Sequence, residues 1–444
     1  MTAINRRRLV TTAATGAAVA AAAGTLAVTG AAASPTHSSP AVMQGQDVAK
    51  VRALVWSNGP VIDAHFEDRL KQFNEAHQGS VEVNLEFLPY DQYWQKLQLG
   101  YASGDIYDVY FWDVQAYGHY KKGLLLDVQP LIDKAVLFKE DEYPTEMFDP
   151  WRFDGTNLYG VPENFQTMAL FYNKDLFDAA GISYPDNTWT YDQVVEAAEK
   201  MTIRNGDRVT QWGMSTGALG IWWGLQTLPW AKGDAFFDKV LEPTKFQFEN
   251  AANVEALDFI RGLVNDKKVA PSPALAQQSS DTTGFQSGLV ALVPDGSWSI
   301  SGFAELPFNW GVTSLPTWGG ERVVPYFMGG WVIAKDTKVA DGAFEWARWS
   351  ASDFQQDMAA QQDWIPVQNA ARASNAATNG LPDGYRDVID ALESAKIGDV
   401  YSLNTQQIWV EVFDPNMQKL LNDNAPAADV AKTMDEGANK ILAE

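Results

Sequence analysis

The feature that most constrains the fold is an alternation of strand-like and helix-like patterns between residues 51 and 112. Residues 51–56 (Val-Arg-Ala-Leu-Val-Trp) predict a strand that ends at the turn-forming residues 57–60. Residues 63–77 predict a helix, because Phe66, Leu70 and Phe73 fall on one face. A strand over 81–87, a helix over 93–102 and a strand over 108–112 follow. This order predicts a parallel α/β sheet wrapped by helices, in which ligands bind beyond the carboxyl ends of the strands.

The rest of the chain predicts a second, differently ordered part. Extended runs are expected at 158–162, 168–172 and 323–334, and an apolar strand at 288–293 that stops at residues 294–296. Helices are expected at 191–201, 251–264 and 340–358. A chain of 444 residues exceeds what one hydrophobic core supports, so we expect two lobes.

The N-terminus predicts export. Three arginines, Arg6, Arg7 and Arg8, precede an uncharged stretch over 9–28, and residues 31–33 offer three alanines for cleavage. Paired arginines before a weakly apolar core are typical of a twin-arginine signal, which we place at 1–33, followed by a flexible leader at 34–46. The alternative is an uncleaved membrane anchor, for which an alanine-rich segment is a poor lipid-facing surface. The sequence has no cysteine, which excludes disulfides, thiol chemistry and a lipid-acceptor cysteine.

The charge balance argues against nucleic acid as a partner. Without the predicted signal, 30 basic side chains face 56 acidic ones, a net charge of about −26. Phosphate binding depends on Lys and Arg neutralising backbone charge, so a neutral ligand is the simpler expectation.

Aromatic and planar polar side chains at predicted strand ends and turns indicate a carbohydrate ligand. An indole ring offers an apolar face and one N–H donor, which suits a pyranose ring. The alternative for each tryptophan is ordinary core packing, to which we assign Trp346 and Trp349 at helical spacing. The candidate tryptophans are Trp56, Trp222, Trp223, Trp298, Trp331 and Trp364. The candidate hydrogen-bonding residues are Asn58, Asp113, Gln115, Glu163, Asn164 and Gln166, whose alternative is a solvated surface role.

Several blocks of sequence resemble a known family, the extracellular solute-binding proteins of the maltose-binding type, which are the sugar-loading subunits of ABC importers. The blocks occur in family order and cover nearly the whole chain after residue 51. They are residues 102–109, 159–162, 170–177, 180–182, 284–293 with 295–298, 325–332 and 364–366.

The resemblance implies a two-lobed periplasmic-binding-protein fold of type II, with lobes joined by several crossings. It implies an N-terminal lobe at 47–164 and 326–364 and a C-terminal lobe at 165–325 and 365–444. It implies a carbohydrate held in an interlobe cleft, importer transmembrane subunits as partners, a monomeric state, and no catalytic residue, metal or cofactor. Among the stacking positions it selects Trp222 or Trp223, Trp298 and Trp331, and Gly329 and Gly330 lie in the matching return segment. Gln115 and Gln166 stand where maltose-type members often place carboxylates, which puts maltose itself in doubt.

The sequence offers less support for three other classes of protein. A glycoside hydrolase also combines an aromatic cleft with two carboxylates, but no acid/base pair in its own motif is identifiable. Gly213-Met-Ser215-Thr-Gly217 matches a nucleophile elbow, yet all four histidines (His37, His65, His77, His119) precede Ser215, against the order that fold requires. The histidines are also scattered, so no metal site is expected. An adhesive or structural protein would not require the observed order of motifs.

Overall fold

The computed structural model describes residues 47–112, 116–139, 142–206, 208–276, 284–303, 306–362, 364–382 and 384–444. The predicted signal and leader, and the candidates Asp113 and Gln115, lie outside the described residues. None of the helices in the described part of the chain is both long and apolar enough to cross a membrane.

The first five elements confirm the alternation expected from sequence. They are β1 (Ala49–Trp56), α1 (Pro60–Ala76), β2 (Val81–Leu88), α2 (Tyr90–Ser103) and β3 (Val109–Trp112). β1 pairs in parallel with β2 and β3, with Ala49 opposite Val81 and Ala53 opposite Val109. β3 is buried throughout, as expected for a strand covered by helices on both faces.

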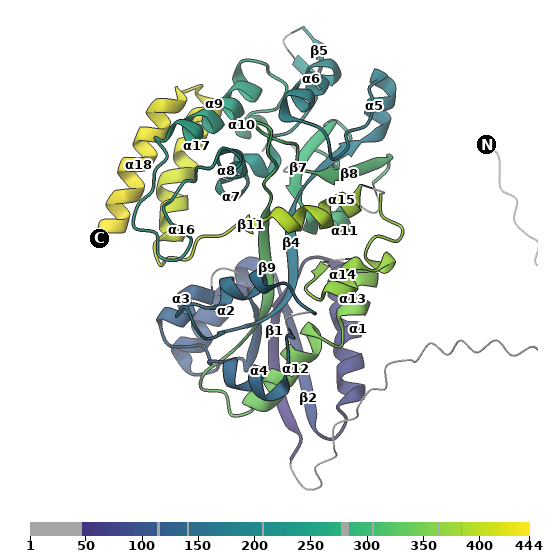
Figure 1. Cartoon of the computed structure of the whole chain (residues 1–444), viewed down its shortest axis with the longest axis vertical. Coiled ribbons are helices and arrows are strands. Elements are labelled where there is room, and N and C mark those ends of the chain that lie inside the picture. The colour runs from purple at the N-terminus through teal and green to yellow at the C-terminus, as the bar shows by residue number, and fades with distance from the viewer. Residues whose placement is uncertain are drawn as a thin grey trace, which may run out of the picture. The chain divides into compact units, whose positions relative to one another are not determined.

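Two long strands connect the lobes. β4 (Val161–Asn173) pairs through its first half with β9 (Pro325–Ile333), and β9 pairs antiparallel with β3. The second half of β4 pairs with β7 (Leu292–Gly296) and β8 (Trp310–Ser314). The short strands β10 (Ile365–Pro366) and β11 (Lys396–Ile397) pair with β4 and β9. We call the part around β1, β2, β3 and β9 lobe 1 and the part around β7 and β8 lobe 2; β4 runs from the one into the other (Figure 1).

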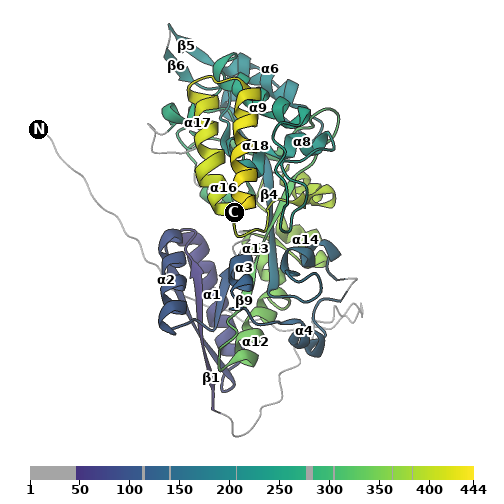
Figure 2. The same cartoon turned by 90° about the vertical axis from the view of Figure 1, so that its left-hand side faces the viewer.

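Helices surround the strands of both lobes. Lobe 1 also contains α3 (Ala116–Lys121), α4 (Gln129–Ala135), η1 (Thr145–Trp151), α12 (Ala340–Ala351), α13 (Gln355–Gln361), α14 (Asn369–Ala373) and η4 (Asn375–Ala377). Lobe 2 contains α5 (Lys174–Ala180), α6 (Tyr191–Met201), the hairpin β5 (Ile203–Asn205) and β6 (Arg208–Gln211), η2 (Gly217–Gly220), α7 (Trp222–Leu225), α8 (Thr227–Ala231), α9 (Ala251–Asn265), α10 (Pro273–Ala276), η3 (Ser297–Ser299), α11 (Ile300–Phe303), α15 (Tyr385–Asp390) and η5 (Ala391–Ser394). The C-terminal elements α16 (Thr405–Ile408), η6 (Trp409–Phe413), α17 (Asp414–Asn422) and α18 (Ala427–Ala443) also belong to lobe 2, and α17 and α18 pack beside α9 (Figure 2).

Local side-chain chemistry explains where two lobe-2 helices begin. Asn173 ends β4 and its side chain accepts a hydrogen bond from Leu176 N at 3.2 Å, so the strand passes directly into α5. Thr190 and Gln193 form a reciprocal capping box at the start of α6, whose bounds match the predicted helix.

The structure corrects three predicted elements. Residues 161–162 of the first predicted run and all of the second, 168–172, belong to one strand, β4, whereas residues 158–160 are not in a strand. The first half of β4 pairs with β9 and the second half with β7 and β8. Residues 294–296, expected to end the strand at 288–293, lie inside β7 and pair with β4. A strand partner therefore overrides the turn preference of Pro, Asp and Gly.

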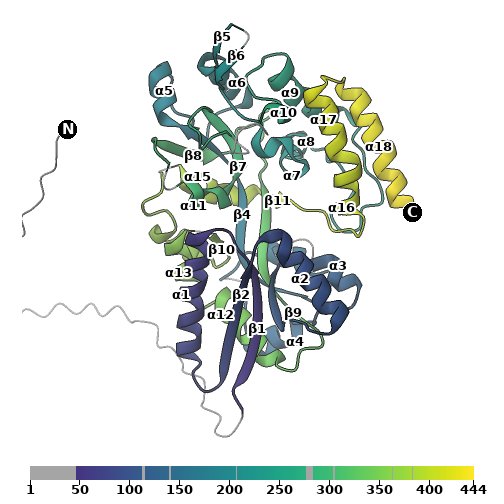
Figure 3. The same cartoon turned by 180° about the vertical axis from the view of Figure 1, so that it is seen from behind.

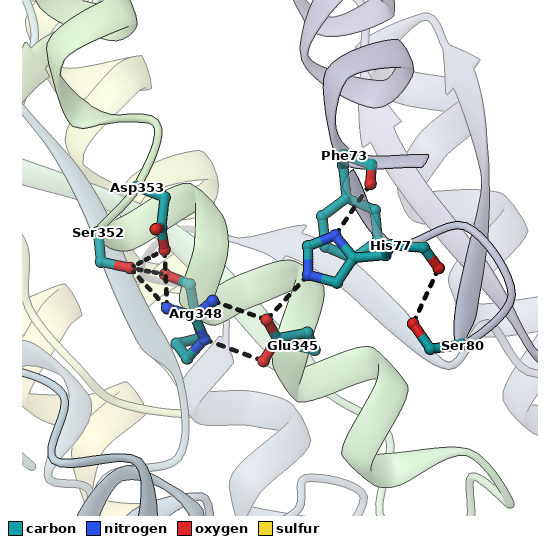
Figure 4. A network of polar contacts seen from close by, with 7 residues as sticks. All are labelled: Phe73, His77, Ser80, Glu345, Arg348, Ser352 and Asp353. Carbon is teal, nitrogen blue, oxygen red and sulfur yellow. Dashed lines mark hydrogen bonds and ion pairs between the residues drawn. The ribbon is translucent and has the colours of Figure 1, made fainter. Parts of the chain in front are cut away.

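The third correction concerns the helix expected over 340–358, which is broken between α12 and α13. Figure 4 shows the reason: Ser352 Oγ lies within hydrogen-bond distance of two acceptors, Arg348 O at 2.8 Å and Asp353 Oδ2 at 2.9 Å, while Arg348 Nη1 donates to the same carboxylate. These side-chain bonds compete with the helical pattern and end α12. The same network joins α1 to α12, because Glu345 accepts from Arg348 and lies 3.0 Å from His77 Nε2 (Figure 4).

Two cores cover opposite faces of β4. The first runs through lobe 1 and continues onto one face of the lobe-2 sheet, where Phe171, Val293 and Val312 belong to it. The second covers the other face, with Leu170 and Leu292 beside α6, α9 and the C-terminal helices. Alternate residues of β4 therefore point into different cores, so its two faces differ in their surroundings. Seen from behind, β4 runs from lobe 2 into lobe 1 (Figure 3).

Candidate functional site

The crossing strands β4 and β9 have two distinct faces. Gln166 lies opposite Phe327 and Asn164 opposite Gly329, whereas Phe165 lies opposite Met328. Directly opposed residues share a face, and neighbours along a strand alternate. Gln166, Phe327, Asn164 and Gly329 therefore occupy one face, which we call the front face, and Phe165 occupies the rear face.

Three partly exposed aromatic rings converge on the front face. Trp223 from α7, Trp298 from η3 and Phe327 from β9 form edge-to-face pairs with ring centroids 5.3–5.7 Å apart. We call them the lobe-2 aromatic cluster. Gly296 and Gly398 permit this packing, since a Cβ on either would stand 2.0 Å from the Trp298 ring or 2.3 Å from the Phe327 ring. Partly exposed aromatic rings on the same face as the amide of Gln166 suit a molecule with an apolar face and hydroxyl groups.

A second aromatic group stands at the carboxyl ends of β1 and β2. Trp56 ends β1 and lies 5.7 Å from Tyr90 and 6.2 Å from Trp94, both at the start of α2. Tyr90 is 43% exposed. We call these three residues the lobe-1 aromatic cluster. Sequence reasoning found Trp56 but missed Tyr90 and Trp94; the signal was their i, i+4 spacing directly after a predicted strand end.

Phe111 and Gly329 connect the two clusters. Phe111 lies 5.1 Å from Trp56, and a Cβ on Gly329 would stand 2.5 Å from Phe111 Cζ. Gly329 is two residues from Phe327 on the same face of β9. Both clusters therefore border the front face, with a glycine in place of a side chain between them.

Asn58 lies at the exposed end of the loop after β1. Its backbone N–H donates to Asp63 Oδ1 at 3.3 Å, and Ser57 Oγ donates to the other oxygen of the same carboxylate at 2.5 Å. Asp63 in the first turn of α1 therefore fixes the loop and leaves the Asn58 side chain exposed.

The structure buries four of the predicted ligand contacts in the cores, contrary to the exposed positions expected of them. Trp331 is fully buried among Phe66, Phe111 and Trp346, and its Nε1 donates to Glu163. Glu163 is fully buried in an ion pair with Arg69 at 2.5 Å. Both side chains are committed to the interior of lobe 1 and offer no surface to a ligand.

The other two buried candidates are tryptophans. Trp364 stacks on Phe111 with centroids 5.1 Å apart and planes at 5°. Trp222 stacks on Trp409 at 4.1 Å, which leaves Trp223 as the member of the pair on the front face. Sequence reasoning left this choice open, because adjacent residues at the start of a helix differ only in the tertiary partner each meets.

Asn164, Gly329 and Gly330 are also buried. A Cβ on Gly330 would stand 2.5 Å from Val161 O, so the pair of glycines is required for the close approach of β9 to β4. Within the described part of the chain the Asn164 amide has no hydrogen-bond partner, and its Nδ2 would stand 2.8 Å from a Cβ on Gly329.

A polar contact between α3 of lobe 1 and Glu242 of lobe 2 joins the lobes. Tyr117 Oη and Lys121 Nζ, both from α3, donate to Glu242 Oε1, the latter over 2.7 Å. Glu242 belongs to a loop that bonds to Tyr401 through Glu242 N and Tyr401 O at 2.8 Å. The hydrogen bonds from Lys121 and Tyr117 lower the pKa of Glu242, and burial together with the Glu242 contact raises the pKa of Tyr117. Nothing in the local sequence around Glu242 signals this contact.

The structure places Ser215, His77 and His119 in separate surroundings. Ser215 is buried and its Oγ accepts from Gly217 N at 2.9 Å. His77 contacts Phe73 O and Glu345, and His119 lies among the rings of Tyr101, Tyr110 and Trp112 in lobe 1. No group of three or more His, Asp or Glu side chains in the described ranges could hold a metal ion.

This chain is similar to known proteins in sequence and in fold. The family model for bacterial extracellular solute-binding proteins matches residues 56–357. The arabinooligosaccharide-binding protein of Bacillus subtilis is 25% identical over 305 residues, which is 65% of this chain and 66% of that protein. The maltodextrin-binding protein of the same organism is 28% identical over 270 residues, 57% of this chain and 58% of that protein. The matches thus span no more than about two thirds of these curated relatives.

Solved structures share the fold. An ABC substrate-binding protein from Listeria monocytogenes in complex with cycloalternan superposes with a TM-score of 0.78 at 24% identity, covering 89% of this chain and all of the other. The GacH receptor of Streptomyces glaucescens superposes with a TM-score of 0.74 at 19% identity, covering 90% of this chain and all of the other. Family match, two lobes and crossing strands agree, and the chain belongs to the bacterial extracellular solute-binding protein family.

Proposed function

We propose that this protein captures a carbohydrate, a neutral oligosaccharide, between its lobes and presents it to the transmembrane subunits of an ABC importer. The observation that carries the proposal is the lobe-2 aromatic cluster: three partly exposed rings beside Gln166 on the front face of the crossing strands. Relatives named for binding arabinooligosaccharides and maltodextrin support the same ligand class.

The proposed contacts divide between the lobes. Lobe 2 supplies Trp223 and Trp298, lobe 1 supplies Trp56 and Asn58, and Gln166 and Phe327 lie on the strands that cross between them. We retain Asp113 and Gln115, which follow β3 in the sequence and lie outside the described residues, as proposed contacts. Only the closed arrangement brings both sets of contacts to one ligand, so binding favours closure.

The same proposal covers the boundaries of the lobes and the route of export. β10, α14 and η4 pack with lobe 1, while α15 packs on β8, so we place the third crossing between η4 and α15 instead of at residues 364–366. The other predicted boundaries are retained. We propose that the chain leaves the cytoplasm through the signal at 1–33, acts as a monomer and performs no reaction on its ligand.

A glycan panel tests the proposal directly. The purified mature chain is heated with neutral mono- and oligosaccharides, and a ligand that binds the native state raises the unfolding temperature. The same mixtures are analysed chromatographically, and X-ray scattering compares the free and saturated protein. Stabilisation with intact sugar and a more compact particle supports a transport receptor. Released product would instead indicate an enzyme, and no stabilisation by any glycan would refute the carbohydrate assignment.

A further inference from the structure

A cavity of about 800 Å³ lies on the rear face of the crossing strands. Its floor is formed by Phe165 and Tyr326, whose rings meet edge to face at 5.8 Å. Their chain neighbours Gln166 and Phe327 point to the front face, because residues alternate along a strand. This rear cavity is therefore separate from the proposed carbohydrate cleft.

Both lobes contribute walls to the rear cavity. Lobe 1 supplies Glu146 from η1, Arg372 from α14 and Asn375 from η4. Lobe 2 supplies Arg386 and Asp390 from α15, which packs on β8, and Glu393 from η5 follows. A molecule in the cavity would therefore contact groups from both lobes.

The two arginines are held in fixed positions by backbone carbonyls. Arg372 Nη1 donates to Pro366 O and Val367 O at 3.1 Å, and Arg386 donates to Arg372 O and Ser374 O at 3.0 and 2.9 Å. Neither guanidinium is within ion-pair distance of Glu146, Asp390 or Glu393 in the described part of the chain. The cavity thus combines arginine donors held in place by backbone carbonyls with three exposed carboxylate acceptors that are not paired with them.

This distribution of groups selects a class of ligand. A single ion would be attracted by one set of charges and repelled by the other, with two cations facing three anions. A neutral molecule with several hydroxyl groups can accept from the arginines, donate to the carboxylates and lay an apolar face on the two rings. The volume falls in the range of small-molecule sites, about 300–1,000 Å³.

We propose that the rear cavity is a second binding site, for a small neutral polyhydroxylated molecule of mono- or disaccharide size. Since its walls come from both lobes, an occupant is linked to the angle between them and so to affinity in the front cleft. The linkage rests on the proposed function, but the existence of the site does not.

The test separates the two sites with a double variant, Trp223→Ala with Trp298→Ala, which removes two of the three rings of the lobe-2 aromatic cluster. Glucose, galactose, maltose and trehalose are titrated into it by calorimetry. We expect at least one of them to bind with one site per chain. An indole placed at the rim of the rear cavity, by Ala373→Trp or independently by Asn375→Trp, should weaken that binding at least about tenfold. Ala428→Trp, at a surface hollow beside α9, is the matched control and should leave it unchanged.

Two results would overturn the second site: none of the four sugars binding to a double variant that unfolds at its normal midpoint, or binding that survives in the folded rim variants. Failure of the proposed function has a different signature. In that case no glycan would bind more tightly to the unmodified chain than to the double variant. The two proposals are thus decided by different measurements.

Discussion

The buried ion pair between Arg69 and Glu163 gives the sharpest test of how lobe 1 is held together. The Arg69 side chain is 3% exposed and that of Glu163 is fully buried. One Glu163 oxygen accepts from Arg69 and the other from Trp331 Nε1, and Gln355 Nε2 donates to Glu163 O at 3.1 Å. Replacing Glu163 by Gln removes the charge but keeps the volume, and it leaves the Arg69 guanidinium buried without a counter-ion. Breaking a buried pair in this way costs about 3–5 kcal/mol of unfolding free energy.

The reverse change, Arg69→Met, is expected to cost at least as much. It leaves the carboxylate unpaired, and it also removes the guanidinium from above the rings of Phe66 and Phe354, 4.5 and 4.4 Å from their centroids. Each such contact is worth about 0.5–1 kcal/mol. The double variant Arg69→Met with Glu163→Gln buries no lone charge, so its cost should fall well below the sum of the single changes, at about 1–3 kcal/mol for the lost hydrogen bonds.

Urea unfolding followed by circular dichroism and tryptophan fluorescence measures these costs. The matched control is Lys50→Met with Glu82→Gln, an exposed pair joining β1 and β2 in the same lobe at 3.7 Å, which should leave the midpoint nearly unchanged. Single variants that lose less than about 1 kcal/mol, or a double variant equal to their sum, would refute the reasoning. Ligand affinity of the folded Glu163→Gln protein should stay unchanged, because the Glu163 side chain is fully buried.

Three further expectations concern the cleft and pH. Trp298→Ala should weaken glycan binding by about 2 kcal/mol in calorimetry, whereas Trp222→Ala should lower stability with little change in affinity; equal effects of both on affinity would contradict the assignment of the front face. Glu242→Gln loses the ionic contact with Lys121 between the lobes, so affinity should fall without a matching fall in the unfolding midpoint, and unchanged affinity would show that the contact does not favour closure. Burial lowers the pKa of His119 from 6.5 to about 4, so the unfolded chain binds a proton that the folded chain rejects; stability should therefore decline as pH falls from 6.5 towards 4, less steeply in His119→Leu, and identical slopes would refute the assignment.

The sequence predicts local elements well where one pattern determines them. β1, α1, β2, α2 and β3 follow from hydrophobic period and turn residues, and α6 coincides with the helix expected at 191–201. The prediction is wrong where strands distant in the sequence determine the extent of an element. β4 is one continuous strand because β9 pairs with its first half and β7 and β8 pair with its second half. The interruption after α12 depends on hydrogen bonds of Ser352 that no helix propensity contains.

The candidate site, too, could be predicted only in part. Composition and position identify tryptophans and amides as a class, which includes Trp223, Trp298 and Gln166 on the front face. They do not distinguish a ring on that face from one such as Trp331, whose surroundings arise when α1, β3 and α12 meet around it. The contact of Glu242 with Tyr117 joins residues far apart in the chain and has no local signature.

The antiparallel insertion of β9 between β3 and β4 sets an order of events during synthesis. When the ribosome has made β3, the edge that β9 will cover is still bare, and all of lobe 2 up to β8 must emerge before residues 325–333 arrive to cover it. Lobe 1 is therefore begun first and completed late, with an unpaired strand edge throughout the interval. A nascent chain of this topology needs shielding until its return segment is made, and truncation before β9 should leave an aggregating fragment instead of an independent lobe.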